Sequence, residues 1–396
     1  MTSMTRWLYI KNGDVVDQLS ALGECPQTVP EGGTEAFIGD FLRYTCGQQV
    51  FLLSCFNRKA YLSNGRVTAL VLKTEGRLTR FRLFKFFLLV YQGINAFFRI
   101  AAYRPHRIIC GSSGAMLWLT CLVSKLLNVP WVHSRHNRVT DPRASMRAKI
   151  VESIDGYCIR RAHAVICHGP YLKQELLDIG IKRSTIHEFD VGFNDFLTQA
   201  GQSTPTPDML PYIAQPFVLY IGRMEAYKGI FDILSALEER LNNTSATGLV
   251  YVGNGKDLPQ LRKEVAGKGL GGQVAILGKQ DRREISVLLR HAKILVVATR
   301  SEFPEGRCMA AMEGLALGVP VVAPDFGPFP YLITHGVNGL LYRTDCVEDL
   351  REKLVSLLDN EAFYRKISQG VAETRHTIIN PSLSFSQAAQ RAFEEG

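Results

Sequence analysis

The sequence predicts an α/β protein built from two Rossmann-like domains that face each other across a cleft. Its 396 residues exceed the usual size of one domain. Short apolar runs alternate with amphipathic stretches, which is typical of parallel sheets flanked by helices. Residues 201–216 are rich in proline, serine and threonine, as interdomain connectors are. We therefore expect a first domain over 1–200, a connector over 201–216, a second domain over 217–375 and a tail over 376–396 that can pack back on the first domain.

Apolar runs of strand length mark the expected sheets. In the second half they are Phe217–Ile221, Leu249–Val252, Val274–Leu277, Ile294–Ala298 and Val319–Ala323. In the first half they are Val50–Leu53, Arg107–Cys110, Val129–Val132 and Ala164–Cys167. Two helices are expected from one-sided apolar faces, the first carrying Ile230, Ile233, Leu234 and Leu237 and the second Val347, Leu350, Leu354 and Leu357. Ligands of such sheets bind beyond the carboxyl ends of the strands, which places a site in the cleft.

The composition is that of a folded globular protein. Apolar residues make up 46% and charged residues 21% of the chain, which excludes a disordered or low-complexity protein. The nine cysteines form no C-x-x-C pair and lie in apolar segments, so we expect reduced, buried thiols. Residues 1–11 contain no apolar core of signal-peptide length. We therefore expect a cytoplasmic protein.

Positive charge is concentrated in the first half. The net charge is +9, with 25 basic and 15 acidic residues before residue 201 and a near balance after it. Between Arg58 and Arg107 there are eleven basic residues and one acid, Glu75. This pattern indicates a surface that faces phosphate, in a nucleic acid, an anionic lipid or a phosphorylated substrate.

Glu305 and Glu313 form the first candidate site, directly after the run Ile294–Ala298. A helix that begins near Gly306 would direct its free N–H groups and positive dipole at a ligand, which suits a pyrophosphate. The two carboxylates would then hold hydroxyls at the two ends of a nucleotide sugar. The alternative is that both are solvated surface glutamates.

Gly222, Arg223 and Lys228 form the second candidate site, in the loop after Phe217–Ile221. The glycine permits a tight turn beside a ligand, and two cations from one loop can neutralise a diphosphate. Such a loop would favour departure of a phosphate leaving group. The alternative is that both cations form ordinary surface ion pairs.

Gly33 and His136 are the candidates in the first half. The pair Gly32-Gly33 precedes a helical pattern, and paired glycines let a phosphate approach the backbone. His136 follows the expected strand Val129–Val132 and would point towards the cleft. Each feature also has a purely structural interpretation, since glycine pairs are common in turns and most histidines are packed side chains.

The combination of motifs resembles the retaining GT-B glycosyltransferases of family four, also called glycosyl transferases group 1. The resemblance covers residues 217–357, with the motifs G-R-x(4)-K-G, G-x-G, E-x(7)-E and G-V-P-V-V-A. In the first half it rests on the loop Gly32-Gly33-x-Glu35, on P-x(5)-H ending at His136 and on the strand A-x-A-V-I-C.

The resemblance implies a role for each candidate. Arg223 and Lys228 hold the donor pyrophosphate, Glu313 holds the nucleotide ribose and Glu305 the transferred sugar. The residues expected against the donor are Gly33, Gly222, Arg223, Lys228, Gly306, Arg307, Cys308 and Glu313. The residues expected at the reaction centre are Glu305, His136, Arg223 and Lys228.

Two positions depart from the family pattern. The family usually has E-G-F-G where this chain has Glu305-Gly306-Arg307-Cys308, so a side chain replaces the last glycine beside the sugar. Tyr331 stands where a glutamate is usual. The identity of the donor is open at these two places.

The resemblance also implies the chemistry. A UDP- or GDP-sugar would transfer its sugar with retention of configuration to a glycan or lipid-linked acceptor, without a metal and without a tightly bound cofactor, in the synthesis of cell-surface polysaccharide or lipopolysaccharide. Two alternatives stay open, another GT-B-type enzyme such as a sugar-nucleotide epimerase or phosphorylase, and a nucleic-acid-binding protein. The second conflicts with the absence of a zinc-finger, RRM or KH motif, so we expect no nucleic acid partner.

The segment from Arg77 to Arg107 combines basic clusters with an apolar run that Lys85, Gln92 and Asn95 interrupt. It is therefore no continuous membrane span. One interpretation is a basic amphipathic helix lying on an anionic membrane, with the protein peripheral on the cytoplasmic face. The alternative is a long core helix with solvated arginines.

Overall fold

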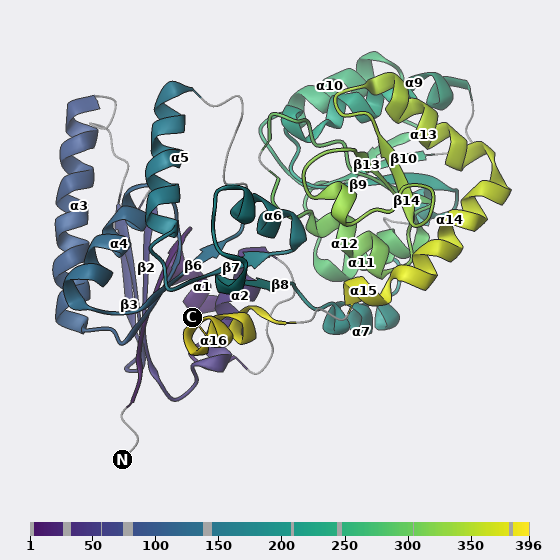
Figure 1. Ribbon diagram of the computed structural model, residues 1–396. Helices are drawn as coiled ribbons and strands as arrows, with labels where there is room; N and C mark the ends of the chain where they lie inside the picture. Colours follow the sequence, from purple (N-terminus) through teal and green to yellow (C-terminus); the bar gives the residue numbers. More distant parts are fainter. Residues whose placement is uncertain are drawn as a thin grey trace. The chain divides into compact units, whose positions relative to one another are not determined.

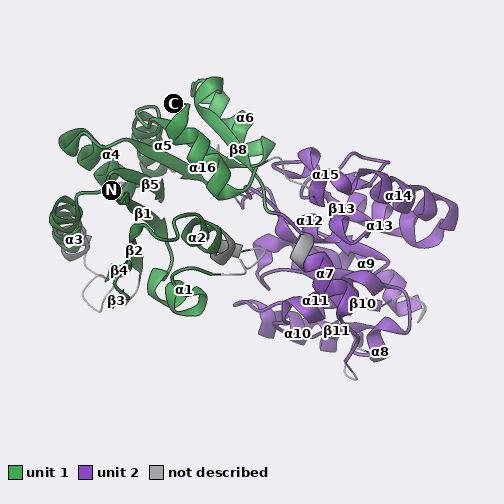
Figure 2. Ribbon diagram, turned by 90° about the horizontal axis from the view of Figure 1, so that it is seen from below, with its two compact units in different colours: residues 1–191, 382–396 green, residues 192–381 purple. Residues whose placement is uncertain are grey.

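The computed structural model describes residues 4–26, 33–56, 58–73, 82–137, 145–206, 210–243, 248–303, 305–379 and 383–395. The chain divides into two compact units (Figures 1 and 2). Unit 1 comprises Met1–Val191 and Ser382–Gly396, and unit 2 comprises Gly192–Pro381. The division thus falls before the expected connector, and residues 382–396 belong to unit 1.

Unit 1 contains an eight-stranded sheet. Its strands are β1 (Arg6–Asn12), β2 (Gln49–Phe56), β3 (Ala60–Ser63), β4 (Val67–Lys73), β5 (Arg107–Gly111), β6 (Trp131–Arg135), β7 (Ala164–His168) and β8 (Ile186–Phe189). Their order in the sheet is β3-β4-β2-β1-β5-β6-β7-β8, and neighbours are parallel except for the edge pair β3 and β4.

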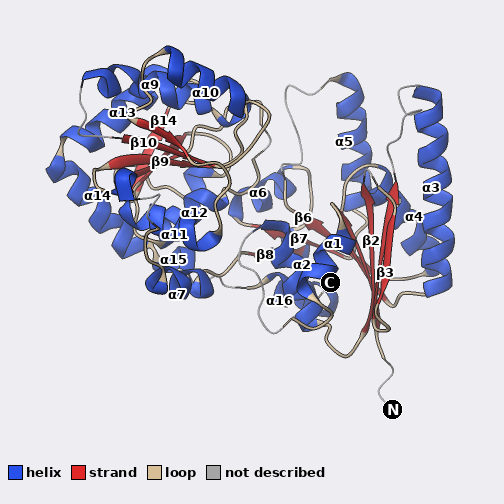
Figure 3. Cartoon of the chain, turned by 180° about the vertical axis from the view of Figure 1, so that it is seen from behind, coloured by secondary structure: helices blue, strands red, loops and turns tan. Residues whose placement is uncertain are grey.

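Helices cover both faces of this sheet. Successive side chains of a strand point to opposite faces, so the side chains of the buried strand β1 contact helices on both sides. Leu8 and Ile10 face the cluster formed with α3 (Arg82–Tyr103), α4 (Ala115–Leu127), α5 (Met146–Ile159) and α6 (Pro170–Asp178). Trp7 and Tyr9 face the cluster formed with α1 (Val15–Leu22), α2 (Gly33–Tyr44) and α16 (Phe385–Glu394). Figure 3 shows the helices around the strands of this unit. A short turn, η2 (Arg183–Thr185), precedes β8.

Unit 2 contains a six-stranded parallel sheet. Its strands are β9 (Phe217–Ile221), β10 (Gly248–Val252), β11 (Val274–Ile276), β12 (Ile294–Val296), β13 (Val321–Pro324) and β14 (Gly339–Tyr342). Their order, β11-β10-β9-β12-β13-β14, is the order of a Rossmann sheet, with the reversal of strand order between β9 and β12.

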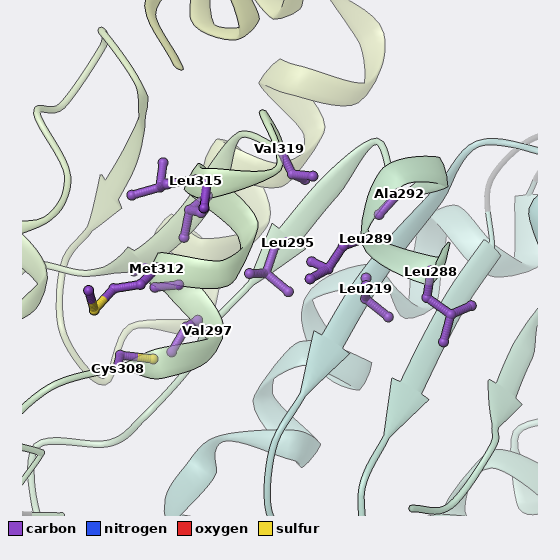
Figure 4. Packing of buried hydrophobic residues seen from close by; sticks show 14 of the residues in the cluster. Leu219, Leu288, Leu289, Ala292, Leu295, Val297, Cys308, Met312, Leu315 and Val319 are labelled. Carbon is purple, nitrogen blue, oxygen red and sulfur yellow. The ribbon is translucent and has the colours of Figure 1, made fainter. Parts of the chain in front are cut away.

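Amphipathic helices pack on both faces of this second sheet. They are α7 (Asn194–Gln202), α8 (Leu210–Ile213), α9 (Ile230–Asn243), α10 (Leu258–Gly267), α11 (Arg282–His291), α12 (Met309–Ala316), α13 (Val347–Asp359), α14 (Glu361–Thr374) and α15 (His376–Ile379), with the turns η3 (Ala226–Lys228) and η4 (Phe329–Tyr331). Figure 4 shows Leu295 and Val297 from the β12 segment among side chains of α11 and α12, including Leu289, Met312 and Leu315.

The structure confirms each expected strand within a few residues, and the expected apolar faces of α9 and α13 are buried apart from the partly buried Val347. The sequence patterns did not predict β1, β3, β4, β8 or β14. The strand β1 was missed although Trp7–Ile10 is an apolar run of strand length, flanked by Arg6 and the buried Lys11.

The structure also bears on the expected state of the cysteines and on the membrane segment. The expectation of free thiols is wrong for Cys25 and Cys46, which form a disulfide in unit 1. The other cysteines are free thiols. Among the described residues, no helix combines the length and the hydropathy that a membrane span requires, α3 included.

Candidate active site

The candidate site of unit 2 lies where the strand order reverses, beyond the carboxyl ends of β9 and β12. Ligands of open parallel sheets bind at this point because the two loops diverge to opposite faces of the sheet. The loop after β9 carries Gly222, Arg223 and Lys228. At Gly229 the loop presses against the β12 loop so closely that an added Cβ would lie 2.0 Å from the carbonyl oxygen of Ala298.

Lys228 and Glu305 form an ion pair across these two loops. Their side chains are 14% and 12% exposed, so the pair is largely shielded from water. The hydroxyl of Thr299 donates a second hydrogen bond, 3.4 Å long, to the Oε2 atom of Glu305. The pair therefore places one cation and one carboxylate at the expected donor position, each holding the other in place.

A stacked aromatic pair lies beside this ion pair. The rings of Tyr227 and Phe303 stack with centroids 4.7 Å apart and an angle of 5° between their planes. The Nζ atom of Lys228 lies 4.2 Å from the centre of the Phe303 ring, and the Cζ atom of Arg223 lies 5.1 Å from it. The two cations thus share one aromatic ring. Arg223 is the more accessible, with its side chain 53% exposed and a distant contact of 3.8 Å to Glu225.

Glu313 lies on α12 and is largely buried. Its Oε1 atom accepts a hydrogen bond of 3.3 Å from Arg282, the first residue of α11. The guanidinium of Arg282 in turn lies 4.7 Å from the ring centre of Phe196 on α7. Three elements distant in sequence therefore fix the orientation of this carboxylate.

Gly306, Arg307 and Cys308 connect Glu305 to α12. The helix begins at Met309, so the expectation of a start near Gly306 is wrong and Glu305 lies in the preceding loop. Burial raises the pKa of the Cys308 thiol to about 12, and the carboxylate of Glu305 adds to the rise. Glu313 contributes in the same direction, so both predicted carboxylates lie within electrostatic range of this one thiol.

The candidates of unit 1 lie on β6 and α2. Gly33 is the first residue of α2. His136 directly follows β6, and its Nε2 atom shares a hydrogen bond of 2.8 Å with the hydroxyl of Ser134. Its ring lies 4.6 Å from the ring of Phe37, one turn into α2, so the glycine-bearing helix packs on the predicted histidine.

His136 is surrounded by other basic groups. Burial lowers its pKa well below the ordinary value, and His168 and Lys11 lower it further. His168 is itself held by a contact of 2.9 Å from its Nε2 atom to Asp190, with its ring stacked on Phe189 at 5.2 Å. His136 is therefore a neutral imidazole at pH 7.

The structure thus brings Arg223, Lys228 and Glu305 together, with Cys308 in electrostatic range of both Glu305 and Glu313. Sequence reasoning missed the residues that position them, which are Arg282, Thr299 and the Tyr227–Phe303 pair. One signal was available for Arg282. Asp281 and Glu284 form a capping box, and D-x-x-E after an apolar run marks a helix start at the carboxyl end of a strand.

Comparison with protein families gives two matches. Residues 211–374 match the family model described as Glycosyl transferases group 1. Residues 32–192 match the model described as Glycosyltransferase Family 4. Together the two matches cover most of both units.

Curated relatives share part of the chain. An uncharacterized glycosyltransferase of Methanocaldococcus jannaschii is 26% identical over 217 residues, 55% of this chain and 56% of the relative. The GDP-mannose:cellobiosyl-diphosphopolyprenol alpha-mannosyltransferase of Xanthomonas oryzae pv. oryzae is 27% identical over 165 residues, 41% of each chain. The matched segments thus span about half the length of these relatives.

A solved structure shares the fold over nearly the whole chain. The Anabaena protein HepE, in a complex with UDP, superposes with a TM-score of 0.68 and 15% sequence identity over 99% of both chains. At this identity the likeness concerns the fold.

Proposed function

Because this chain belongs to glycosyltransferase family 4 and has the GT-B architecture, we propose that it transfers a sugar from a UDP- or GDP-sugar to a glycan or lipid-linked acceptor. The transfer retains the anomeric configuration and needs no metal. The pathway we propose is the synthesis of cell-surface polysaccharide or lipopolysaccharide. The observation that carries the proposal is the shielded Lys228–Glu305 pair at the reversal of strand order, with Arg223 on the same aromatic ring.

This geometry supports different roles for the two cations and for the carboxylate of Glu305. A diphosphate placed at the loop after β9 would meet Arg223 and Lys228, which offset the negative charge that grows on the leaving phosphate. Glu305 would then exchange its contact with Lys228 for hydroxyls of the transferred sugar. Its carboxylate would also stabilise an oxocarbenium-like transition state.

Glu313 would hold the ribose of the donor nucleotide. Its carboxylate is already oriented by Arg282, so little conformational entropy is lost when it binds two hydroxyls. The neutral His136 of unit 1 would border the reaction centre as a hydrogen-bonding group. With no general base assigned on the protein, the leaving phosphate would take the proton of the acceptor hydroxyl in a front-face attack.

The donor and acceptor classes are supported by relatives. The crystal structure of HepE is of a complex with UDP, and the Xanthomonas relative is named for GDP-mannose and a cellobiosyl-diphosphopolyprenol. An acceptor on a polyprenol lies at a membrane, so we propose that this chain works as a peripheral protein on the cytoplasmic face.

Donor binding gives the direct test. Calorimetry with UDP-, GDP- and ADP-sugars should find one donor that binds the purified chain and raises its melting temperature. Arg223→Ala and Glu313→Gln should each weaken that binding at least tenfold. The exposed Arg262→Ala on α10 is the control and should bind as the wild type does. Unchanged binding by the first two variants would refute the assigned site.

Product analysis tests the chemistry. With a suitable acceptor, the new glycosidic bond should keep the anomeric configuration of the donor, as measured by NMR, and EDTA should leave the rate unchanged. Inversion, or a rate abolished by EDTA, would contradict the mechanism. A product that is an altered nucleotide sugar formed without acceptor would favour an epimerase instead.

A further inference from the structure

Exposed apolar side chains are concentrated on three helices of unit 1. Of the 17 large hydrophobic residues that are exposed in the described chain, 11 lie on α3, α4 and α5. The remaining six are scattered over both units. Soluble proteins seldom expose many apolar residues on neighbouring elements unless that surface binds something.

These residues lie on the outer sides of the helices. On α3, Ile94 and Phe98 are 52% and 66% exposed, while Ala96 and Ile100 face the sheet and are buried. The pair is spaced by four residues, which places both side chains on one helix face. The outer stripe of α3 is therefore apolar where a solvated helix would be polar.

The neighbouring helices continue this surface. On α4, Leu122 and Leu126 are 51% and 60% exposed, and on α5 Ile150 and Ile154 are 54% and 38% exposed. The helix α4 packs between α3 and α5, and all three cover the same face of the unit 1 sheet. We name the outer sides of these helices the α3–α5 surface.

The charge on this surface is positive. Among the side chains that the structure describes, α3, α4 and α5 carry the cations Arg99, Lys125, Arg147 and Lys149 and the acids Glu152 and Asp155. Exposed cations on the surface include Lys125 of α4 and Arg147 and Lys149 of α5.

One of the two acids of α5 is held inside unit 1, and the other lies near a cation. Asp155 is buried, and its carboxylate accepts hydrogen bonds from the backbone N–H of Gly114 and from the indole of Trp118. Glu152 lies close enough to Arg135 to raise the pKa of that guanidinium against the lowering caused by burial. The exposed cations Arg99, Lys125, Arg147 and Lys149 therefore outnumber the partly exposed Glu152, which favours an anionic partner.

We propose that the α3–α5 surface docks on an anionic lipid bilayer, with Phe98, Leu126 and Ile154 entering the boundary between headgroups and acyl chains. Apolar side chains beside cations fit a surface that is apolar beneath a negative layer of headgroups. A second copy of this chain fits less well, because it would bring the same cations face to face. Only the role of this docking rests on the proposed function, because docking would bring the enzyme to a lipid-linked acceptor.

Vesicle binding by the full chain tests the proposal. Sedimentation with phosphatidylcholine vesicles that contain phosphatidylglycerol should recover the protein, and vesicles of phosphatidylcholine alone or high salt should reduce the binding at least tenfold. Phe98→Glu combined with Ile154→Glu should reduce it by a similar factor. Val337→Glu in unit 2, which also replaces an exposed apolar residue, is the matched control and should bind as the wild type does. Donor binding, measured without vesicles, reports on the proposed function separately.

A second measurement keeps the test valid if the glutamate variants do not fold. Ile154→Trp preserves an apolar side chain, and its fluorescence should be quenched by brominated lipids in anionic vesicles, whereas that of Val337→Trp should not change beyond the wild-type background. Absent vesicle binding, equal loss in the control or an unquenched Ile154→Trp would overturn the proposal. So would a dimer in solution that Phe98→Glu and Ile154→Glu dissociate.

Discussion

The Lys228–Glu305 pair limits what each residue can be replaced by. Both side chains are largely buried, so removal of one charge leaves the other without a partner in a poorly solvated place. Glu305→Gln should therefore lower the free energy of unfolding of unit 2 by about 1–3 kcal/mol. Donor turnover should fall at least a hundredfold. Thermal unfolding and initial rates measure the two effects.

Thr299→Val is the control for this prediction. It removes one hydrogen bond of 3.4 Å to the same carboxylate and leaves the charge pair intact, so its effects should be much smaller. Equal losses in the two variants would mean that packing of the loop, and not the charge of Glu305, determines the activity.

Arg282 is predicted to act through Glu313. Arg282→Ala removes the guanidinium that orients the carboxylate, so donor binding should weaken about tenfold. The neighbouring Arg283, which is exposed, gives the matched control Arg283→Ala. Calorimetry with the donor measures both variants, and equal affinities would assign Arg282 to stability alone.

The sequence showed the carboxylates but not their partners. Glu305 and Glu313 are recognisable because a short motif holds them beside one strand. Arg282 is 31 residues from Glu313, and Glu305 is 77 residues from Lys228. Such pairs depend on the order of strands in the sheet, which periodicity along one strand does not encode.

At the scale of elements, two loops are locked together at Gly229. The residue has a φ of 71°, and a Cβ there would overlap the Ala298 carbonyl that follows β12. Gly229→Ala should therefore destabilise unit 2 by about 3 kcal/mol or more. Gly267→Ala at the end of α10, where a Cβ meets open space, should be neutral or slightly stabilising. Thermal unfolding of both variants checks the comparison.

Most of the strands that the sequence predicts are unbroken apolar runs. β9 is apolar throughout, so its bounds were predicted to the residue. β1 lies at the centre of its sheet, but its apolar run is flanked by Arg6 and by Lys11, whose burial depends on neighbours from β2 and β5. A lysine is buried by residues that are distant in the sequence, so the local sequence pattern does not predict its burial.

At the scale of the whole molecule, unit 1 should be sensitive to acid. Burial lowers the pKa of His133 to about 3 and that of His136 well below the ordinary value. The unfolded chain therefore binds protons that the folded chain does not. For His133, stability is complete above about pH 6.5 and falls by about 1.4 kcal/mol per pH unit as the pH drops towards 3, and His136 adds a loss in the same direction.

Denaturant unfolding at several pH values measures this slope. His133→Gln removes one titrating group and should flatten the slope between pH 6 and 4, whatever its effect on stability at pH 7. An equally steep slope in His133→Gln would assign the acid sensitivity to other groups.

The helix α16 should be essential to unit 1 although it follows unit 2 in the chain. Phe385, Ala388 and Ala389 are buried in the same cluster as Trp7 and Phe41. A chain that ends before residue 383 should lose the native state of unit 1, which hydrogen exchange would detect as lost protection in β1 and β7. The sheet of unit 2 should keep its protection. A fully protected unit 1 would show that α16 adds little.

The position of α16 also sets an order of events during synthesis. A ribosome must make all of residues 192–379 before residues 383–395 emerge. Unit 2 can therefore fold before the last helix of unit 1 has been synthesised. The part of the protein that is translated first is therefore completed last, and until then its nascent chain exposes the apolar surface that α16 will cover.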